Sequence, residues 1–471
     1  MNKTKIIATV GPATYSRQVL VSMIREGVNV VRINFSHGTY EEYSGVIQSI
    51  REINLEEGYH TAILADLQGP KLRIGEMEEG AELIEGNNVV ITNKEVVGTK
   101  DKLYVNYDLI AKDLNPGDKV LINDGKVSLK VVSSNNEDEV TATVVQGGLL
   151  TSKKGVNLPD TGVSLPSLTE KDLKDLNFAL KHELEWIALS FVRSSKDILD
   201  LKEKIAEQNG FAKVIGKIEK PQALDDVDKI IDACDGIMVA RGDLGVEVPL
   251  QYLPLIQKKL VNQARIHSKP VIIATQMMDS MIESITPSRA EVNDVANAVM
   301  DGADAVMLSA ETSIGKYPLE VIQTMYKIIE NAETYDGIYH KDDVVSSNTN
   351  RTISNAICQN SAKLARDTGA TAIVTMSFSG YTGFKISSYR PKANTFVFTA
   401  NRNILNMLSL LWGVRGYYYN KFVSTDDTIN DIIENLKMQK LISEGDLIIN
   451  IASMPIKGKG MSNMLKLSEV G

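Results

Sequence analysis

The chain has 471 residues, which is too long for one compact domain and predicts about two to four. Hydrophobic residues make up 43% and charged residues 24% of the sequence, the composition of an ordinary globular protein. The net charge of -9 argues against general binding to nucleic acids, although local clusters of lysine and arginine could still hold a phosphorylated substrate.

Cysteine usage and hydropathy bear on the compartment. Cys234 and Cys358 show no CxxC spacing, so we expect two buried thiols in a reducing environment. The apolar run near the N-terminus is too short for a signal peptide, and no apolar run is long enough to span a bilayer. We therefore expect a cytoplasmic protein that does not enter membranes.

Apolar strand-like segments alternate with helical patterns through much of the chain. Strands are predicted at residues 6–10, 30–35, 62–67, 186–191, 214–219, 236–240, 271–276 and 305–308. They are rich in Val, Ile and Ala without polar alternation, which is typical of parallel strands buried on both faces. A helical pattern covers residues 250–266, and Thr286-Pro287 predicts another helix start with Thr286 as N-cap. The pattern indicates an α/β fold with a (β/α)8 barrel, which we assign to residues 1–70 and 167–341.

The alternation breaks between residues 71 and 166, where short strands and turns are predicted. Strands at 120–122 and 127–132 flank Asn123–Lys126 as a hairpin, and Pro116-Gly117 is a turn dipeptide. This all-β insertion follows the third barrel strand, so it leaves the barrel at the end where active sites of such barrels lie. We predict that it forms a β-barrel lid domain over that site.

A third unit, residues 342–471, is predicted to be an open α/β domain. A helix is expected at 351–368, and strands at 372–376, 395–399, 416–419, 447–451 and 464–467. The first strand is followed by the sequence MSFSGYT, whose hydroxyl groups and helix-start amides could bind a phosphate. A well-capped helix start explains the same sequence equally well. The candidate phosphate-binding residues are Ser377, Ser379, Gly380, Tyr381 and Thr382.

Charged residues at the carboxyl ends of two barrel strands carry the main functional signal. Lys217 and Glu219 lie two positions apart, so they point to the same face of their strand, and Asp243 follows the next strand. Two carboxylates with room for waters and a phosphate are the usual way that proteins hold Mg2+. A lysine beside such a metal can stabilise negative charge that develops during a reaction. An ion pair and a tight Gly-Asp turn explain the same residues without a metal.

Polar and cationic residues follow the second, third and seventh strands: Arg32, Asn34, Ser36, His37, Asp66, Lys71, Arg73 and Thr275. Each of them alone fits a helix cap or an ordinary ion pair. The two arginines and the threonine, together with the lysine and the two carboxylates, form a set typical of phosphoryl transfer: Arg32, Arg73, Thr275, Lys217, Glu219 and Asp243. The chain has only five histidines, so acid–base work would fall to lysine, hydroxyls and water. The sequence has neither a Walker A motif nor GxGxxG, which argues against a standard nucleotide-binding loop.

A series of motifs, in order along the whole chain, resembles the pyruvate kinase family. They read TKIIATVGPAT, VVRINFSHG, DLQGPKLRIG, KKGVNLP, ALSFVR, KIEKPQAL, MVARGDLGVEVP, ATQMMDSM, PSRAEVNDVANAVMDGADAVMLSAET and GKYP. The resemblance implies a phosphotransferase that moves the phosphoryl group of phosphoenolpyruvate to ADP, giving pyruvate and ATP in the last step of glycolysis. It also implies the barrel, lid and C-terminal domain predicted above, usually in a homotetramer.

The resemblance assigns roles to individual residues. Glu219 and Asp243 match the family's ligands for Mg2+ or Mn2+. Lys217 matches the lysine that stabilises the moving phosphoryl group and the enolate, and Thr275 the residue near the carbon that gains a proton. Substrate contacts are implied for Arg32, Gly242, Asp243 and Thr275. Nucleotide contacts are implied for Asn34, Phe35, Ser36, His37, Arg73 and Lys154.

The sequence departs from the family at the potassium site of many members. The residues that match this site are Asn34, Ser36, Asp66 and the backbone of Leu67. Members that need K+ typically carry Thr, Lys and Glu where this chain has Leu67, Gln68 and Lys71, and the Leu/Gln/Lys set resembles the K+-independent branch. We expect the ammonium group of Lys71 to take the place of the cation, so that K+ is not required.

The resemblance also bears on regulation and on rival interpretations. In the family, the loop that matches residues 377–382 binds a sugar phosphate or nucleotide effector. Lys457 and Lys459 could add charge there, but they do not match the arginine or tryptophan of some members regulated by fructose 1,6-bisphosphate.

The extra C-terminal domain of some bacterial members is expected to be absent. A Mg2+-dependent pyruvate or oxaloacetate aldolase and a metabolite sensor without catalysis are the alternative functions.

Overall fold

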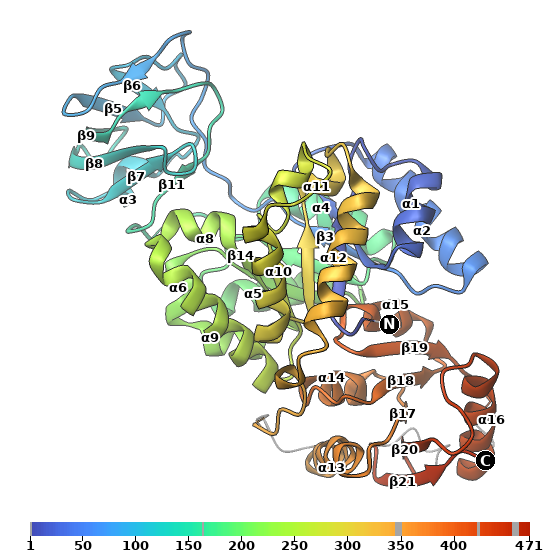
Figure 1. The fold of residues 1–471 in the computed structure, drawn as a ribbon. Coiled ribbons are helices and arrows are strands. Elements are labelled where there is room, and N and C mark those ends of the chain that lie inside the picture. Colours follow the sequence, from blue (N-terminus) through green and yellow to red (C-terminus); the bar gives the residue numbers. More distant parts are fainter. Residues whose placement is uncertain (1, 163, 344–350, 422–423, 455–460) are drawn as a thin grey trace.

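The computed structural model describes residues 2–162, 164–343, 351–421, 424–454 and 461–471, which form three units (Figure 1). The central unit is a closed barrel of parallel strands, as predicted. Its strands follow the order β1 (Lys5–Thr9), β16 (Ala305–Leu308), β15 (Val271–Ala274), β14 (Gly236–Ala240), β13 (Lys213–Ile218), β12 (Trp186–Leu189), β3 (Ala62–Asp66) and β2 (Val28–Asn34). Almost all residues of these strands are buried, because helices cover the barrel and side chains fill it.

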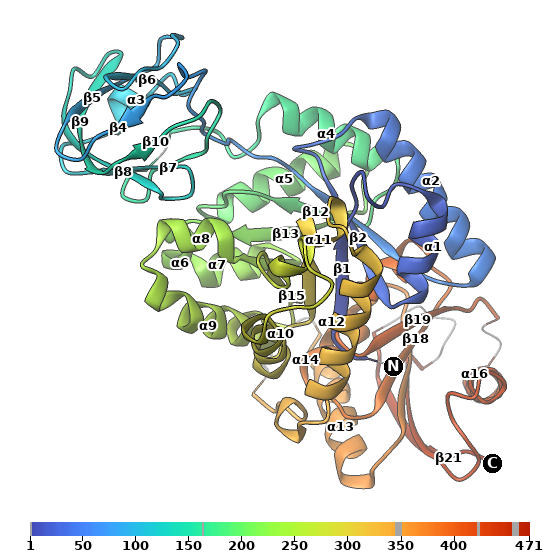
Figure 2. The same cartoon turned by 45° about the horizontal axis from the view of Figure 1, so that its top comes forward.

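The helices that follow the barrel strands surround it in a ring, as Figure 2 shows. They are α1 (Arg17–Arg25), α2 (Tyr40–Glu57), α4 (Glu170–Lys181), α5 (Ser195–Glu207), α6 (Pro221–Asp225), α7 (Val227–Ala233), α8 (Arg241–Glu247), α9 (Leu253–Ile266), α10 (Arg289–Asp301), α11 (Ala310–Ser313) and α12 (Pro318–Ala332). Short 3-10 helices are η1 (Leu250–Tyr252), η2 (Asp279–Ile282) and η3 (Asp336–Ile338). The helix predicted at 250–266 is therefore divided between η1 and α9. None of the described helices is both long and apolar enough to cross a bilayer.

Two element boundaries differ from the prediction for clear physical reasons. Helix α10 begins at Arg289 rather than at Thr286-Pro287, because Ser288 is its N-cap. The Ser288 hydroxyl accepts from the Glu291 amide and the Glu291 carboxylate accepts from the Ser288 amide, which satisfies two free donors at once. Strand β15 ends at Ala274, before the predicted 276, because Thr275 has a φ of 69°.

The β insertion projects from the barrel and has its own apolar core (Figure 1). Its six-stranded sheet has the order β11 (Val156–Asn157), β7 (Lys119–Ile122), β8 (Val127–Ser134), β9 (Glu139–Gln146), β5 (Asn88–Thr92) and β6 (Lys102–Tyr104). Strands β4 (Glu82–Leu83) and β10 (Gly148–Leu149) form a separate ribbon, and α3 (Ile110–Asp113) is a single turn. The predicted hairpin is present as β7 and β8. Within the described residues the sheet is open rather than the closed β-barrel that was predicted, with the short strands β6 and β11 at its two edges.

The C-terminal unit is the predicted open α/β domain. Its sheet has the order β19 (Val414–Tyr418), β18 (Asn394–Thr399), β17 (Ala372–Met376), β20 (Leu447–Ala452) and β21 (Met464–Glu469), with β21 antiparallel. The helices are α13 (Thr352–Thr368), α14 (Tyr381–Ser388), α15 (Arg402–Met407) and α16 (Thr425–Met438), with η4 (Leu408–Leu410) after α15. Both cysteines are free and buried, as predicted. The domain boundaries at 70/71, 166/167 and 341/342 stay predictions.

The C-terminal unit closes the amino-terminal end of the barrel. Met407 and Leu410 join the apolar cluster that fills the barrel interior. The Trp186 indole donates to the Met407 carbonyl oxygen (3.3 Å), and Arg390 is paired with Asp304 in full burial (2.8 Å). The open mouth is therefore the opposite end, where the carboxyl ends of the strands meet and where the β insertion is attached (Figure 2).

Candidate active site

Four charged side chains of alternating sign lie in a row at the barrel mouth. Two nitrogens of Arg32 on β2 reach Asp66 Oδ2 at 2.7 Å, and Asp66 ends β3. Lys217 Nζ lies 3.1 Å from Asp66 Oδ1 and 3.0 Å from Glu219 Oε1. All four residues are at most 9% exposed. The parallel pairing of β2 with β3, and of β3 and β13 with the strand β12 between them, brings these strand ends together, which is why residues far apart in the sequence meet in one buried network.

Hydrogen bonds from neighbouring strands hold this row in place. Lys217 donates to the Ser190 hydroxyl just after β12 (2.7 Å), and Arg32 donates to the Thr9 hydroxyl at the end of β1 (2.9 Å). The backbone amide of Phe191 donates to Glu219 Oε2 (2.7 Å). Phe191 has a φ of 54°, unusual for a bulky residue, and this conformation points its amide at the carboxylate. Each charged group therefore has a fixed orientation.

The two carboxylates of the row differ in their electrostatics. Burial would raise the pKa of Asp66, but the charges of Lys217 and Arg32 outweigh it and hold the pKa below its usual value. At Glu219, burial raises the pKa and the nearby Asp243 charge adds to the rise, while Lys217 opposes it. Burial also works to lower the pKa of Lys217, yet Asp66 and Glu219 together raise it. The lysine therefore stays charged, and Glu219 lacks full compensation for its negative charge.

Asp243 lies in the first turn of α8 and is half-buried. Its charge opposes ionisation of Glu219 and so adds to the rise in the pKa of that carboxyl group. Among the residues that the structure describes, no group of three or more His, Cys, Asp or Glu could hold a metal ion. A divalent metal at Glu219 and Asp243 would thus take its other ligands from substrate and water, as Mg2+ commonly does.

Strands β14 and β15 bring Gly242 and Thr275 together. The Gly242 amide donates to Thr275 Oγ1 (2.7 Å), and the Thr275 hydroxyl donates to the Ala274 carbonyl oxygen (2.5 Å). Arg241 fixes the loop by donating to the Thr275 carbonyl oxygen and pairing with Asp294, both at 2.7 Å. Thr275 is β-branched and has a φ of 69°, a strained conformation that places its hydroxyl at the mouth.

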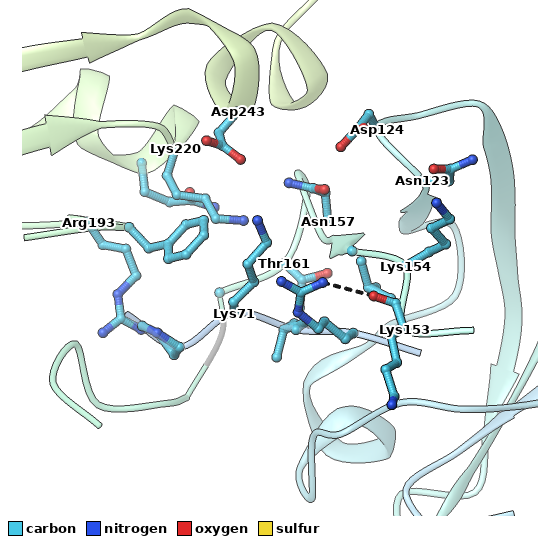
Figure 3. Close-up of a pocket in the computed structure, with 18 of the residues that line it drawn as sticks. Lys71, Asn123, Asp124, Lys153, Lys154, Asn157, Thr161, Arg193, Lys220 and Asp243 are labelled. Atoms are coloured by element: carbon cyan, nitrogen blue, oxygen red, sulfur yellow. Dashed lines mark hydrogen bonds between the residues drawn. The ribbon is translucent and has the colours of Figure 1, made fainter. Parts of the chain in front are cut away.

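A cavity of about 520 Å3 lies between the barrel mouth and the β insertion (Figure 3). Its cationic lining residues are Lys71, Arg73, Lys153, Lys154, Arg193 and Lys220. Asp243 lies on its barrel side and Asp124 on its insertion side. Arg73 is fixed by donating to the Lys153 carbonyl oxygen (2.9 Å). The cavity has the size of a small-ligand site and the charge to hold several phosphate groups.

Comparisons with known proteins agree with this architecture. The family described as "Pyruvate kinase, barrel domain" matches residues 1–322, and "Pyruvate kinase, alpha/beta domain" matches residues 355–468. The chain belongs to the pyruvate kinase family. The pyruvate kinase of Corynebacterium glutamicum is 42% identical, over 100% of this chain and 98% of that relative. The pyruvate kinase of Geobacillus stearothermophilus is 41% identical, over 99% of this chain and 80% of the relative. A crystal structure of a pyruvate kinase from Cryptosporidium parvum has a TM-score of 0.93 and 34% identity, covering 100% of this chain and 96% of that one.

The residues predicted from the pyruvate kinase motifs to contact the nucleotide do not all face one space. Arg73 and Lys154 line the cavity. The Phe35 ring is buried against Tyr43 and Phe178, so only its backbone can reach a ligand. The segment from Asn34 to His37 turns sharply, with the Asn34 side chain accepting from the Ser36 amide (3.1 Å), and leaves Ser36 half-buried and His37 exposed at the mouth.

The role of Lys71 in place of a potassium ion stays a prediction. Lys71 was expected to supply its charge beside Asp66, but within the described residues it makes no ion pair with that carboxylate, whose partners are Arg32 and Lys217. Its side chain extends into the cavity, which Lys220 also lines (Figure 3). The reason is local: Gly69 has a φ of 67° and its carbonyl oxygen accepts from the Lys71 amide, a turn that directs the chain toward the insertion.

Several residues of the site were not predicted. Ser190 holds Lys217, and its position directly after β12 could have been found by examining every strand end. Lys220, Arg193 and Asn157 line the cavity as well. Asn157 belongs to the motif KKGVNLP, but its role depends on how the insertion sits against the barrel, for which the sequence has no signal.

The predicted effector loop is only partly free to bind a ligand. Gly380, with a φ of 78°, precedes α14 and provides no side-chain cap. Thr382 is buried and accepts a hydrogen bond from Thr375 (3.0 Å), and the Tyr381 hydroxyl donates to Asn355 (2.5 Å). Ser377 is half-buried and Ser379 is exposed. Lys457 and Lys459 lie outside the described residues.

Proposed function

We propose that the barrel mouth transfers the phosphoryl group of phosphoenolpyruvate to ADP and yields pyruvate and ATP. The observation that carries this proposal is the buried row Arg32–Asp66–Lys217–Glu219 beside Asp243, open to a cationic cavity. Phosphoryl transfer requires positioning and neutralisation of charge more than covalent chemistry by the protein. Enolpyruvate is a good leaving group, and its ketonisation makes the transfer downhill.

We assign Lys217 to the transferred phosphoryl group and the developing enolate. Its ammonium is fixed by Ser190 and stays charged between two carboxylates, so it needs no reorganisation when negative charge develops. Arg32 would bind the phosphate of the substrate, and the Gly242 amide and Thr275 hydroxyl would exchange their mutual bond for substrate contacts. Thr275 lies where a proton could reach the enolate carbon, directly or through water.

The family generally requires a divalent metal, and we propose Mg2+ or Mn2+ at Glu219 and Asp243. The donor set fits, because the uncompensated charge of Glu219 beside Asp243 would be relieved by a cation. When bound, such a metal would neutralise phosphate charge. Nucleotide contacts are proposed for Arg73 and Lys154, and for the backbone and side chains of residues 34–37.

We also propose that K+ is not required. The matching family site is Asn34, Ser36, Asp66 and the Leu67 backbone, and this chain carries Lys71 close by in sequence. Lys71 extends into the cavity, so its charge would act on the phosphates rather than on Asp66 (Figure 3). This changes the expected mechanism of the replacement but not its expected outcome, since the Lys71 ammonium still supplies a positive charge in the cavity.

The proposal is tested by pyruvate formation from phosphoenolpyruvate, ADP and Mg2+ in a KCl titration that begins at zero potassium. We expect full activity without K+ in the wild type. Lys71→Ala should lose about tenfold at zero K+ and recover part of it with KCl, while Lys119→Ala, an exposed lysine on β7, should change by less than about twofold. Activity that appears only with K+ would support the kinase function and refute the proposal that Lys71 replaces K+. Cleavage of a 4-hydroxy-2-keto acid without ATP formation would support the alternative function as an aldolase. Binding of phosphoenolpyruvate without turnover would support a metabolite sensor without catalysis.

We further propose a cytoplasmic homotetramer regulated by a phosphorylated metabolite at the loop before α14. Ser377, Ser379 and the first amides of α14 would hold the phosphate. A panel of sugar phosphates and nucleoside monophosphates should contain a compound that shifts half-saturation with phosphoenolpyruvate by about fivefold or more. Ser379→Asp should abolish the shift, and Ser443→Asp, on an exposed loop of the same domain, should not. The regulatory proposal fails if no compound moves the saturation curve.

A further inference from the structure

Glu247 is a buried carboxylate that joins the barrel to the β insertion. It ends α8 and is 6% exposed. Its Oε1 receives two donors, Lys220 Nζ at 2.5 Å and the Asn157 side-chain amide at 2.8 Å. Its Oε2 is buried without a hydrogen-bond partner among the described residues. Such an arrangement is a poor way to gain stability, because a buried acceptor remains unsatisfied.

The two partners of Glu247 come from different units, Lys220 from the barrel and Asn157 from the β insertion, and both line the cavity (Figure 3). Lys220 directly follows Glu219, the proposed metal ligand. Asn157 ends β11 and directly follows the segment Lys153–Val156, which lines the cavity from the insertion side. Strand β11 pairs with β7, so the position of Asn157 is coupled to the sheet of the insertion.

Helix α8 connects Glu247 to the metal site as well. Asp243 precedes Glu247 by four residues on this helix, so the two carboxylates lie on the same side, one turn apart. Asp243 is the proposed metal ligand. Glu247 holds Lys220, which follows Glu219, and the side-chain amide of Asn157, which follows the segment proposed to contact the nucleotide. Phosphoenolpyruvate contacts are proposed at Arg32, Gly242 and Thr275, none of which bonds to Glu247.

We propose that Glu247 is a positioning residue for phosphoryl transfer to the nucleotide. Its carboxylate fixes the Lys220 ammonium, which lines the cavity with Asp243, and through Asn157 it holds the segment that carries Lys154. Its role in catalysis rests on the proposed function, whereas its role in holding the insertion does not. Asn157 follows the segment with the proposed nucleotide contact Lys154, and none of the proposed phosphoenolpyruvate contacts Arg32, Gly242 and Thr275 bonds to Glu247, so the loss affects ADP more than phosphoenolpyruvate.

The test compares Glu247→Gln, Asn157→Ala and the double variant in steady-state kinetics. Each single variant should raise the KM for ADP by about tenfold, and the KM for phosphoenolpyruvate should stay within about twofold. The double variant should resemble Glu247→Gln, because that substitution already weakens the contact with Asn157 that Asn157→Ala removes. Glu247→Asp, which keeps the charge, should recover part of the loss. The matched control is Glu139→Gln, which removes a glutamate paired with a lysine, Lys102, on the sheet of the insertion.

Two readouts separate this inference from a merely structural role and from the proposed function. Hydrogen exchange at the Val156 amide, which is bonded to the Leu72 carbonyl oxygen, should be faster in Glu247→Gln than in the wild type without any substrate. If the wild type shows no turnover, the proposed function fails. The role of Glu247 in holding the insertion is then judged by hydrogen exchange alone, and an unchanged rate at the Val156 amide in Glu247→Gln would overturn it. If the wild type turns over, equal changes in both KM values, additive effects, or a lowered Tm with unchanged KM values would overturn the inference.

Discussion

Replacing Lys217 with methionine is expected to lower kcat by about 100- to 1,000-fold, the usual effect of removing one fixed donor to developing charge. Methionine fills a similar volume but leaves the phosphoryl group and the enolate without the ammonium. The substitution also leaves Asp66 and Glu219 without the cation between them. The measurement is pyruvate formation at saturating phosphoenolpyruvate, ADP and Mg2+.

The matched control lies on the same strand. Lys213 begins β13 and pairs with Asp235 at 3.2 Å, at the opposite end of the barrel from the site. Lys213→Met should keep kcat within about twofold of the wild type. Lys217→Arg keeps the charge without the position, so it should remain strongly impaired while folding normally by circular dichroism. A Lys217→Met enzyme with more than about a tenth of wild-type kcat would contradict the assigned role.

The barrel was predictable because its strands are buried on both faces and therefore read as unbroken apolar runs. The strand ends were less predictable, since Phe191 and Thr275 adopt positive φ values that a sequence does not announce in bulky or β-branched residues. Those same residues aim groups at the site, the Phe191 amide at Glu219 and the Thr275 hydroxyl at Gly242. Departures from the expected strand lengths thus coincide with the functional positions.

The charged residues of the site also fall into two groups, those whose position could be predicted from the sequence and those whose position could not. Lys217, Glu219 and Asp243 could be found from the sequence because adjacent parallel strands bring their carboxyl ends together. Lys71 was expected beside Asp66, but a turn at Gly69 directs it into the cavity. The contact between Asn157 and Glu247 depends on how two separately folded units meet, which follows from neither strand periodicity nor motif spacing.

Replacing Asp243 with asparagine is expected to raise the Mg2+ concentration for half-maximal activity by at least about 100-fold, because one of two protein ligands loses its charge. Asp243 makes no ion pair among the described residues, so the substitution removes little besides its charge at the cavity. Removing the metal from the wild type with a chelator should abolish activity, and added Mg2+ or Mn2+ should restore it.

A second carboxylate in the same cavity separates metal binding from general electrostatics. Asp124 lies on the insertion side, so Asp124→Asn removes the same charge from the cavity without touching the proposed metal ligands. Its Mg2+ requirement should shift by less than about threefold, an effect of cavity charge alone. Mn2+ binding measured by electron paramagnetic resonance without substrates should weaken in Asp243→Asn and not in Asp124→Asn. Equal effects of the two substitutions would mean that the cavity attracts cations by its overall charge, and that Glu219 and Asp243 are no metal site.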